Sequence, residues 1–322
     1  MIRYLLMVFG INCNNKWIGN FLTGLTLSLF SLVAIPIIFP ISLNDDLQVL
    51  ILKISCSLTD ASKIISILII KFNSSKIVRL YDQIKEYQIK SFIKHKYYFS
   101  TMTSILIAFI TSGSTTAAYY YDFYFSKLFK EFTEKQELLP INQKLQLILL
   151  HFYVHAWKTL LELMYRDFNT RYISIIESLI QELNRKVDKP ERNVIINAQR
   201  TVLQLIEFQS NFKKHLDFIK YFIFIDILLL SGVMIYALLY VPTFNLNFNI
   251  FSLSNLILMS IHSLWTFRSG FKAKYLSEEL IFKLNRWKEL KMDGISFIEM
   301  KVLQRTVDIF KGNENIEATG SP

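Results

Sequence analysis

The chain alternates between long apolar stretches and shorter polar stretches that are rich in Lys and Arg. A helix needs about 20 mostly apolar residues to cross the hydrocarbon core of a bilayer, since each residue adds only about 1.5 Å. Six stretches meet this requirement: 18–43, 47–70, 99–121, 145–165, 221–240 and 248–267. The pattern therefore predicts an all-α protein, a polytopic bundle of six transmembrane helices.

Apolar residues also recur at helical spacing in two of the polar stretches, 71–98 and 166–220. We expect several membrane helices to continue through these stretches and to pack together beyond the membrane. The alternative is that the stretches form amphipathic helices lying on anionic lipid. The chain then divides into a segment 1–17, a six-span bundle 18–267 that includes both helical loops, and a C-terminal segment 268–322.

Lys and Arg are distributed unevenly between the two sets of loops. With the N-terminus inside, the inner segments hold 29 of the 36 Lys and Arg residues and the outer loops hold four. Positive residues concentrate on the cytoplasmic side of membrane proteins. We therefore expect a multi-pass protein of the plasma membrane with both the N-terminus and the C-terminus in the cytoplasm.

The fourth apolar stretch is the most polar of the six. It contains four ionisable residues at intervals of four, three and four, which places them on one face of a helix: His151, His155, Lys158 and Glu162. Ionisable groups inside a membrane usually face a water-filled cavity or a partner, so we expect this face to point into the bundle. Two His residues one turn apart could chelate a metal. Because no matching cluster lies on another span, we expect no metal and no other cofactor.

Composition narrows the function classes further. The chain has 322 residues, of which 52% are hydrophobic and 19% are charged, whereas soluble domains carry about 25% charged residues. The formal charge of +10 could suggest nucleic-acid binding, but the basic residues lie between apolar stretches, where topology explains them. We find no phosphate-binding Gly-rich loop, no nucleophile elbow and no zinc-protease helix, and we expect no enzyme.

Three parts of the chain resemble one family of receptors, in the same order. Residues 4–10 are apolar and end in Phe-Gly, like the stretch before the first span of that family. The inner segment around 171–173 and 202–205 is similar to its helical linker between the fourth and fifth spans. Residues 302–310, followed by 316–320, resemble the segment just before its last helix. The chain thus resembles the arthropod gustatory-receptor family, which is related to insect odorant receptors.

The resemblance implies a seven-helix receptor with an intracellular N-terminus. Members of the family assemble as tetramers that act as ligand-gated cation channels, so homo- or hetero-tetramers with other receptor subunits are expected, with membrane depolarisation as the output. The most specific family signature is Thr-Tyr followed by Gln-Phe in a seventh helix. The chain ends at Pro322 before such a helix, so we expect a fragment that binds ligand or partners without conducting.

The family binds its ligands in a pocket in the outer half of each subunit. Depth and polarity, rather than a fixed motif, lead us to expect five residues in the pocket wall: Tyr119, Tyr120, His151, His155 and Tyr236. The alternative role for the tyrosines is anchoring at the membrane surface. The expected ligand is a small-molecule tastant. Residues 291–310 would belong to an anchor formed by the cytoplasmic helix extensions.

Two other classes of membrane protein fit part of the pattern. A secondary transporter would also suit the polar stripe of the fourth span, but transporters usually show internal repeats and helices broken by Gly or Pro. We detect no repeat, and the chain contains only nine Gly. A G-protein-coupled receptor is disfavoured by the inward N-terminus and by the absence of an Asp-Arg-Tyr motif.

The His155→Leu substitution tests the pocket assignment. If His155 lines the ligand path, replacing its imidazole with an apolar side chain should change the dose–response curve for a tastant. The curve would be recorded as calcium entry into cells that express the receptor. An unchanged curve would count against a place for His155 in the pocket.

Overall fold

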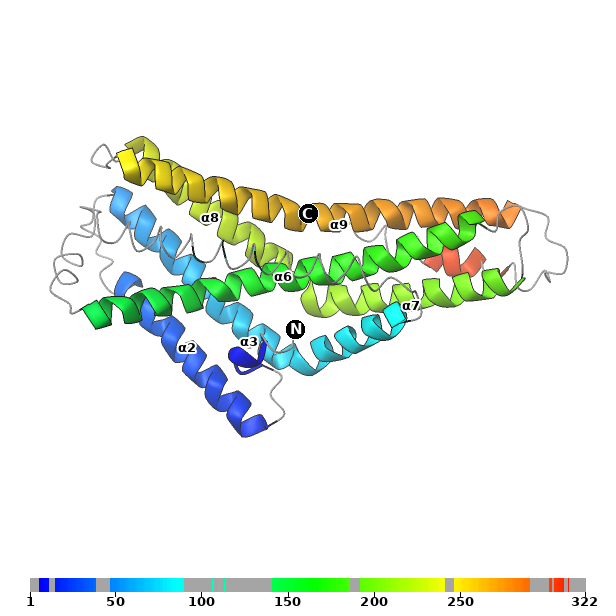
Figure 1. The fold of residues 1–322 in the computed structure, drawn as a ribbon, viewed down its shortest axis with the longest axis horizontal. Helices are drawn as coiled ribbons and strands as arrows, with labels where there is room; N and C mark the ends of the chain where they lie inside the picture. Colours follow the sequence, from blue (N-terminus) through cyan, green and yellow to red (C-terminus); the bar gives the residue numbers. More distant parts are fainter. Residues whose placement is uncertain are drawn as a thin grey trace. The chain divides into compact units, whose positions relative to one another are not determined.

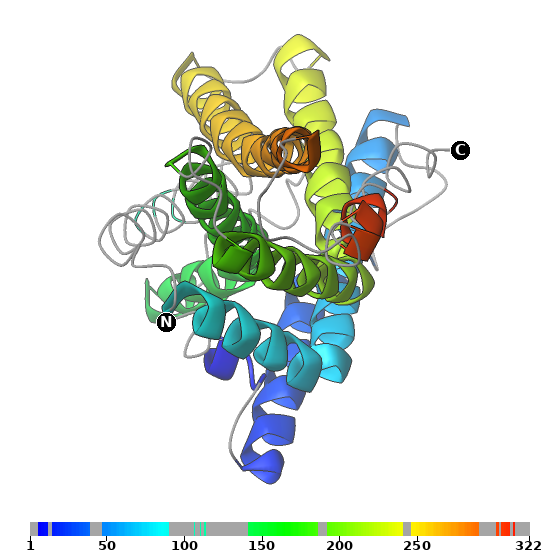
Figure 2. The same cartoon turned by 90° about the vertical axis from the view of Figure 1, so that its right-hand side faces the viewer.

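Helices make up the part of the chain that the computed structural model describes (Figures 1 and 2). That part comprises residues 6–11, 15–38, 47–89, 141–185, 192–240, 246–289, 301–302 and 304–309, with the single residues 106, 110, 113 and 312. The long helices are α2 (Lys16–Ile38), α3 (Leu47–Ile89), α6 (Ile141–Arg185), α7 (Arg192–Leu216), α8 (Phe218–Tyr240) and α9 (Leu246–Glu289). The predicted all-α class is confirmed for this part of the chain.

Three of these helices are much longer than the spans predicted within them. Helices α3, α6 and α9 contain 43, 45 and 44 residues, respectively. Helix α3 runs through most of the predicted inner loop 71–98, and α6 and α7 fill most of the loop 166–220. The predicted third span, 99–121, lies outside the described residues except at positions 106, 110 and 113.

Among the residues that the structure describes, no helix is both long enough and apolar enough to cross a membrane. The six spans and the orientation of the chain stay predictions.

The chain forms two compact units. Unit 1 contains residues 1–78, 101–165 and 218–266, and unit 2 contains residues 79–100, 166–217 and 267–322. Helices α3, α6 and α9 each contribute their N-terminal part to unit 1 and their C-terminal part to unit 2. The boundary between the units in α6, at 165/166, and the one in α9, at 266/267, each lie within one residue of the end of a predicted span.

The N-terminal part of unit 1 begins with a single helical turn that closes in a Schellman motif. The amide of Gly10 donates to the carbonyl of Met7 at 2.9 Å, and the amide of Ile11 donates to the carbonyl of Leu6 at 2.9 Å. Gly10 has a φ of 73°, the left-handed conformation that this motif requires and that Gly adopts without strain. Leu6 and Ile11, which flank the motif, are both buried.

The turn is fixed to helices α2 and α3 through the carbonyl of Gly10. Lys71 Nζ on α3 donates to this carbonyl oxygen at 2.7 Å. The hydroxyl of Thr23 on α2 lies 3.1 Å from the same oxygen and 2.8 Å from Gly19 O, and its single hydrogen can serve either acceptor. Residues 6–11 therefore connect two helices of unit 1.

Unit 2 is built around an aromatic cluster from α3, α6 and α7. Neighbouring rings in this cluster have centroids between 4.2 and 6.3 Å apart, and its members are Tyr81, Phe168, Tyr172, Phe208 and Phe212. The hydroxyl of Tyr172 lies 3.1 Å from Ser277 Oγ on α9. The periodic apolar residues of the inner loops thus pack against protein.

The Gly10→Ala substitution should destabilise unit 1. A Cβ atom at position 10 would lie 2.3 Å from Thr23 N and 2.6 Å from Gly19 O, closer than real Cβ contacts allow. A non-Gly residue held at positive φ costs about 1–3 kcal/mol in addition. We expect the melting temperature of the purified protein to fall by several degrees.

Gly24→Ala is the matched control, because a Cβ atom there meets nothing within 4 Å. Ala is favoured over Gly in a helix by up to about 1 kcal/mol, so this variant should melt at the wild-type temperature or above. Equal losses in the two variants would contradict the tight docking of Gly10.

Candidate functional site

Of the five residues predicted to line the pocket, the structure describes three, and of these only the backbone. His151 and His155 lie on α6 and Tyr236 lies on α8, while the side chains of all three are outside the described residues. Tyr119 and Tyr120 lie outside them altogether. The pocket wall therefore stays a prediction.

The other half of the polar stripe on α6 lies inside unit 1. Glu162 is 2% exposed and Lys158 is partly buried. A second cation, Lys63 on α3, is 5% exposed. Buried charges are stable only when they are paired or hydrogen-bonded, so this side of α6 faces protein, as the sequence predicted for Lys158 and Glu162.

A small cavity lies beside the two lysines. Its volume is about 10 Å³, and it is lined by Ser62, Lys63 and Ser66 of α3, Lys158 and Leu161 of α6, and Phe222 and Ile223 of α8. About 10–15 Å³ is the space that one water molecule needs. The cavity therefore has room for at most one water molecule and is far too small for an organic ligand.

An indole hydrogen bond joins α6 to α3 next to this cavity. Trp157 is completely buried, and its Nε1 donates to Ser66 Oγ at 2.8 Å. The hydroxyl of Ser66 in turn donates to the carbonyl of Lys63 at 2.7 Å. The ring of Phe9 packs edge-on against Trp157 with centroids 4.8 Å apart. The only polar atom of the Trp157 side chain is therefore satisfied in an apolar setting.

Tyr153, one turn before Trp157, connects α6 to α2 and to the N-terminal turn. Its hydroxyl lies 2.8 Å from Thr26 Oγ1 and 3.2 Å from Val8 O, and its ring stacks on Phe9 at 4.8 Å. Thr26 Oγ1 also lies 2.8 Å from Leu22 O. Each hydroxyl has one hydrogen, so Tyr153 donates either to Thr26, which then donates to Leu22, or to Val8.

Tyr153 and Trp157 are not among the site residues predicted from the sequence. A Tyr and a Trp spaced by four residues in the interior of a predicted span, away from the membrane surface where such residues usually gather, are a signal that could have found them. Buried Tyr and Trp side chains need a partner for their polar atom. Their partners here come from other helices, so the sequence could have indicated the pair but not what it binds.

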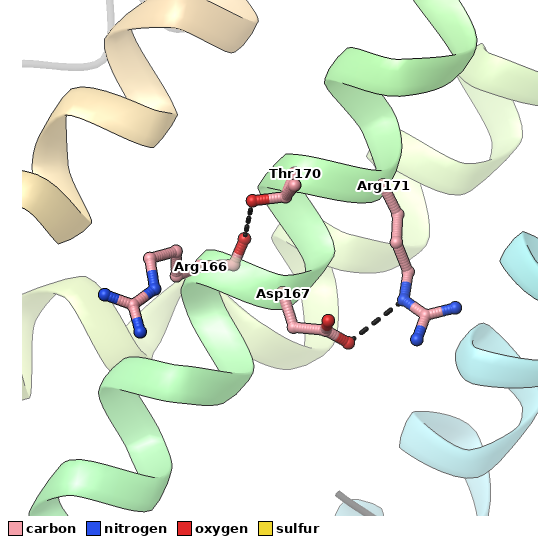
Figure 3. Close-up of polar contacts among 4 residues, drawn as sticks. All are labelled: Arg166, Asp167, Thr170 and Arg171. Atoms are coloured by element: carbon pink, nitrogen blue, oxygen red, sulfur yellow. Dashed lines mark hydrogen bonds and ion pairs between the residues drawn. The ribbon is translucent and has the colours of Figure 1, made fainter. Parts of the chain in front are cut away.

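A second polar cluster occupies one turn of α6 in unit 2. Figure 3 shows Asp167 and Arg171 pointing toward one another, while Arg166 points away on another side of the helix. Arg171 Nε lies 3.0 Å from Asp167 Oδ2, and its guanidinium carbon lies 5.8 Å from the centre of the Tyr81 ring. Thr170 Oγ1 donates to the carbonyl of Arg166 at 2.8 Å.

Burial controls the protonation of this cluster. Removal from water raises the pKa of the Asp167 carboxyl above its ordinary 3.8, and the charge and hydrogen bond of Arg171 offset only part of this rise. The pKa of Tyr81 is raised well above 10.0, first by burial and then by the negative charge of Asp167, while Arg171 acts to lower it. Tyr81 therefore stays neutral at physiological pH.

Across the described residues, no three His, Cys, Asp or Glu side chains come together in a group that could hold a metal ion.

Comparison with known proteins gives a match of fold. No family model matches the sequence, and no curated protein matches it either. Among solved structures, the chain is similar to the insect olfactory receptor OR5 from Machilis hrabei, with a TM-score of 0.66 and 10% sequence identity. The match covers 96% of this chain and 87% of that one. The chain has the fold of that receptor.

The Asp167→Asn substitution tests the burial of the carboxyl. Because the pKa of Asp167 is raised in the folded state, the stability that this group contributes is present at low pH and lost as pH rises through the raised pKa. Asn stays neutral throughout. The melting temperature of the wild type should therefore rise relative to that of the variant when pH is lowered from neutral to mildly acidic.

Arg171→Gln serves as the companion variant. It removes the cation that lowers the pKa of Asp167. When pH is lowered, the melting temperature of this variant should therefore begin to rise at a higher pH than that of the wild type. A wild type that loses stability relative to Asp167→Asn on acidification would mean that the carboxylate, rather than the neutral acid, is favoured by folding.

Proposed function

We propose that the chain is a subunit of a chemosensory receptor of the insect type, in which receptor subunits form a ligand-gated cation channel in the plasma membrane. The observation that carries this proposal is the fold match to an insect olfactory receptor over 96% of the chain at a TM-score of 0.66. Fold alone does not determine function. The order of the sequence features and the surface chemistry of the two units support it independently.

The described helices of unit 1 carry apolar side chains on their outer faces. Large apolar residues are exposed on α2 at Trp17, Ile18, Phe21 and Leu25, on α3 at Ile54, Leu58, Ile65, Leu68 and Phe72, on α8 at Tyr221, Phe224, Ile225 and Leu228, and on α9 at Ile257, Ile261 and Leu264. Those of α3 recur at spacings that form one narrow stripe. Contiguous apolar surface of this extent is unusual for a soluble monomer and is expected where lipid is the solvent.

The interior of unit 1 is mainly apolar, but it also contains buried polar and charged residues, among them Thr23, Thr26, Lys63, Ser66, Thr159 and Glu162. An apolar exterior with polar groups buried between helices is typical of helical membrane proteins that enclose a hydrated path or bind their helices together by hydrogen bonds. This distribution supports a multi-pass location for unit 1.

The described surface of unit 2 is mainly polar. Its exposed residues include Asp82, Gln181, Glu182, Asn184, Arg185, Asn197, Arg200, Glu207 and Lys214. The exposed apolar residues of α2, α3 and α8 lie in unit 1, whereas most of the exposed described residues of unit 2 are charged or polar. A cytoplasmic location for unit 2, next to the inner membrane surface, follows from the proposal and agrees with the excess of Lys and Arg in its segments.

Aromatic and basic residues occur together at the starts of two predicted spans. Trp17 stacks on Phe21 with centroids 5.8 Å apart, directly after Lys16. Lys220 Nζ lies 5.1 Å from the centre of the Tyr221 ring. Such pairs are favoured at the boundary between lipid and water, which supports the same placement of the first and fifth spans.

A gustatory role is the finer part of the proposal. The Phe9-Gly10 pair is one of the segments by which the chain resembles gustatory receptors, and Gly10 is required by the fold because of its positive φ and its contact with Thr23. We propose a small-molecule tastant as ligand and a tetramer with other receptor subunits. Taste perception through membrane depolarisation would be the output.

The test is to express the transcript, with whatever it encodes beyond Pro322, in cells loaded with a calcium indicator. Tags at both ends of the protein should bind antibody only after the cells are permeabilised, because both termini are expected in the cytoplasm. A panel of tastants should evoke calcium entry and an inward cation current in cells with the receptor, and not in untransfected cells.

Substrate uptake without current would favour a transporter, and tags accessible from outside would overturn the proposed orientation. The Gly24→Ala variant is the matched expression control, and Gly10→Ala should lose surface expression and response together.

A further inference from the structure

Helix α9 has two distinct faces just beyond the predicted sixth span. One face is buried in unit 2 and consists of Ala273, Leu276, Ser277 and Leu280. The opposite face carries exposed or half-exposed residues at positions i, i+3, i+4 and i+7: Arg268, Phe271, Lys272 and Tyr275. Phe271 is 73% exposed and Tyr275 is 65% exposed. Two large aromatic rings thus stand beside two cations on the outer face of the helix.

The charges along this part of α9 follow an order. Arg268, Lys272 and Lys274 come first, and the first acidic residues, Glu278 and Glu279, follow one turn later. Lys272 Nζ lies 2.7 Å from Glu177 Oε1 on α6, and both side chains are about half exposed. An ion pair at this level of exposure is weak, so the Lys272 ammonium keeps most of its capacity to bind an anion.

Position along the helix gives the depth of these residues in a membrane. The helix rises about 1.5 Å per residue, so Arg268 to Lys272 lie roughly 1.5 to 8 Å beyond Phe267, where the predicted span ends. The headgroup layer on each side of the hydrocarbon core is roughly 5–8 Å thick. This step relies on the membrane location in the proposed function. The exposed face of α9 then begins at the level of the lipid phosphates.

We propose that Arg268, Phe271, Lys272 and Tyr275 form a binding surface for anionic phospholipid headgroups of the inner leaflet. The planar Arg268 guanidinium suits a phosphate oxygen pair, and the Lys272 ammonium adds a second positive contact. By the same rise, the ring of Phe271 begins about 6 Å beyond the span, within the interfacial layer where aromatic side chains are favoured, and the ring of Tyr275 begins about 12 Å beyond it, at the outer edge of the headgroups. Contact of this face with the same face of a second copy would bring like charges together, which disfavours such a pairing.

The experiment places a photoreactive benzophenone side chain at position 275 of the full chain. The protein is reconstituted in phosphatidylcholine vesicles that contain a minority of phosphatidylserine, irradiated, and analysed by mass spectrometry. We expect lipid adducts in which phosphatidylserine is enriched several-fold over its share in the vesicles. Raised salt should reduce the enrichment, because exposed charges are screened.

Charge variants locate the binding surface. Each Lys or Arg near an anionic membrane surface contributes a factor of about five in affinity, so Arg268→Gln and Lys272→Gln should each lower the enrichment by about that factor. Glu177→Gln removes the ion pair but keeps the Lys272 ammonium, and it should leave the enrichment unchanged or raise it. Arg286→Gln, an exposed cation farther along α9, should have no effect.

Three outcomes would overturn the inference. A cross-link to a second copy of the chain would assign this face to an interface between subunits. Lipid adducts without enrichment of phosphatidylserine would leave no role for the cations, and loss of enrichment in Glu177→Gln would attribute the effect to the broken ion pair. A chain that does not enter vesicles at all would refute the proposed function itself, whereas tastant responses with unselective adducts would refute only the lipid surface.

Discussion

The carbonyl oxygen of Gly10 is the point at which three segments of unit 1 meet. It accepts the ammonium of Lys71 from α3 and lies within hydrogen-bond reach of Thr23 on α2. The approach is possible only because Gly10 has no side chain and adopts a positive φ. Phe9 is thereby fixed between Tyr153 and Trp157, so the packing of α6 depends on a backbone conformation at the very start of the chain.

Helix α6 depends on this docking because both of its sides are buried in unit 1. Tyr153 and Trp157 lie on one side, and Lys158 and Glu162 lie on the other. Each polar group on these side chains must find a partner inside the protein, since the surfaces around them are apolar. The partners of the aromatic pair are Ser66 on α3 and Thr26 on α2 or Val8 of the N-terminal turn. A displacement of the turn would therefore leave a phenol and an ammonium buried with fewer partners.

Periodicity predicted the helices well and the contacts between them poorly. The spacing of apolar residues in 71–98 and 166–220 indicated helices beyond the predicted spans, and α3, α6 and α7 occupy most of these ranges. Spacing also placed Lys158 and Glu162 on one buried face. It could not give the bond from Trp157 to Ser66, which joins residues 91 positions apart, because local patterns define faces and leave partners open. The positive φ of Gly10 had no signal in the sequence beyond the Phe-Gly ending.

The two units follow different rules for what lies outside. In unit 1 most of the large exposed side chains are apolar, while in unit 2 the exposed faces are mainly charged. Both interiors are mainly apolar, and each also holds charged groups, Lys63 and Glu162 in unit 1 and Arg166 and Asp167 in unit 2. Asp167 pairs with Arg171 on the same helix. Since α3, α6 and α9 each belong to both units, a single helix must satisfy both rules. For this reason, the apolar residues of each of these three helices do not follow a single periodic pattern from one end of the helix to the other.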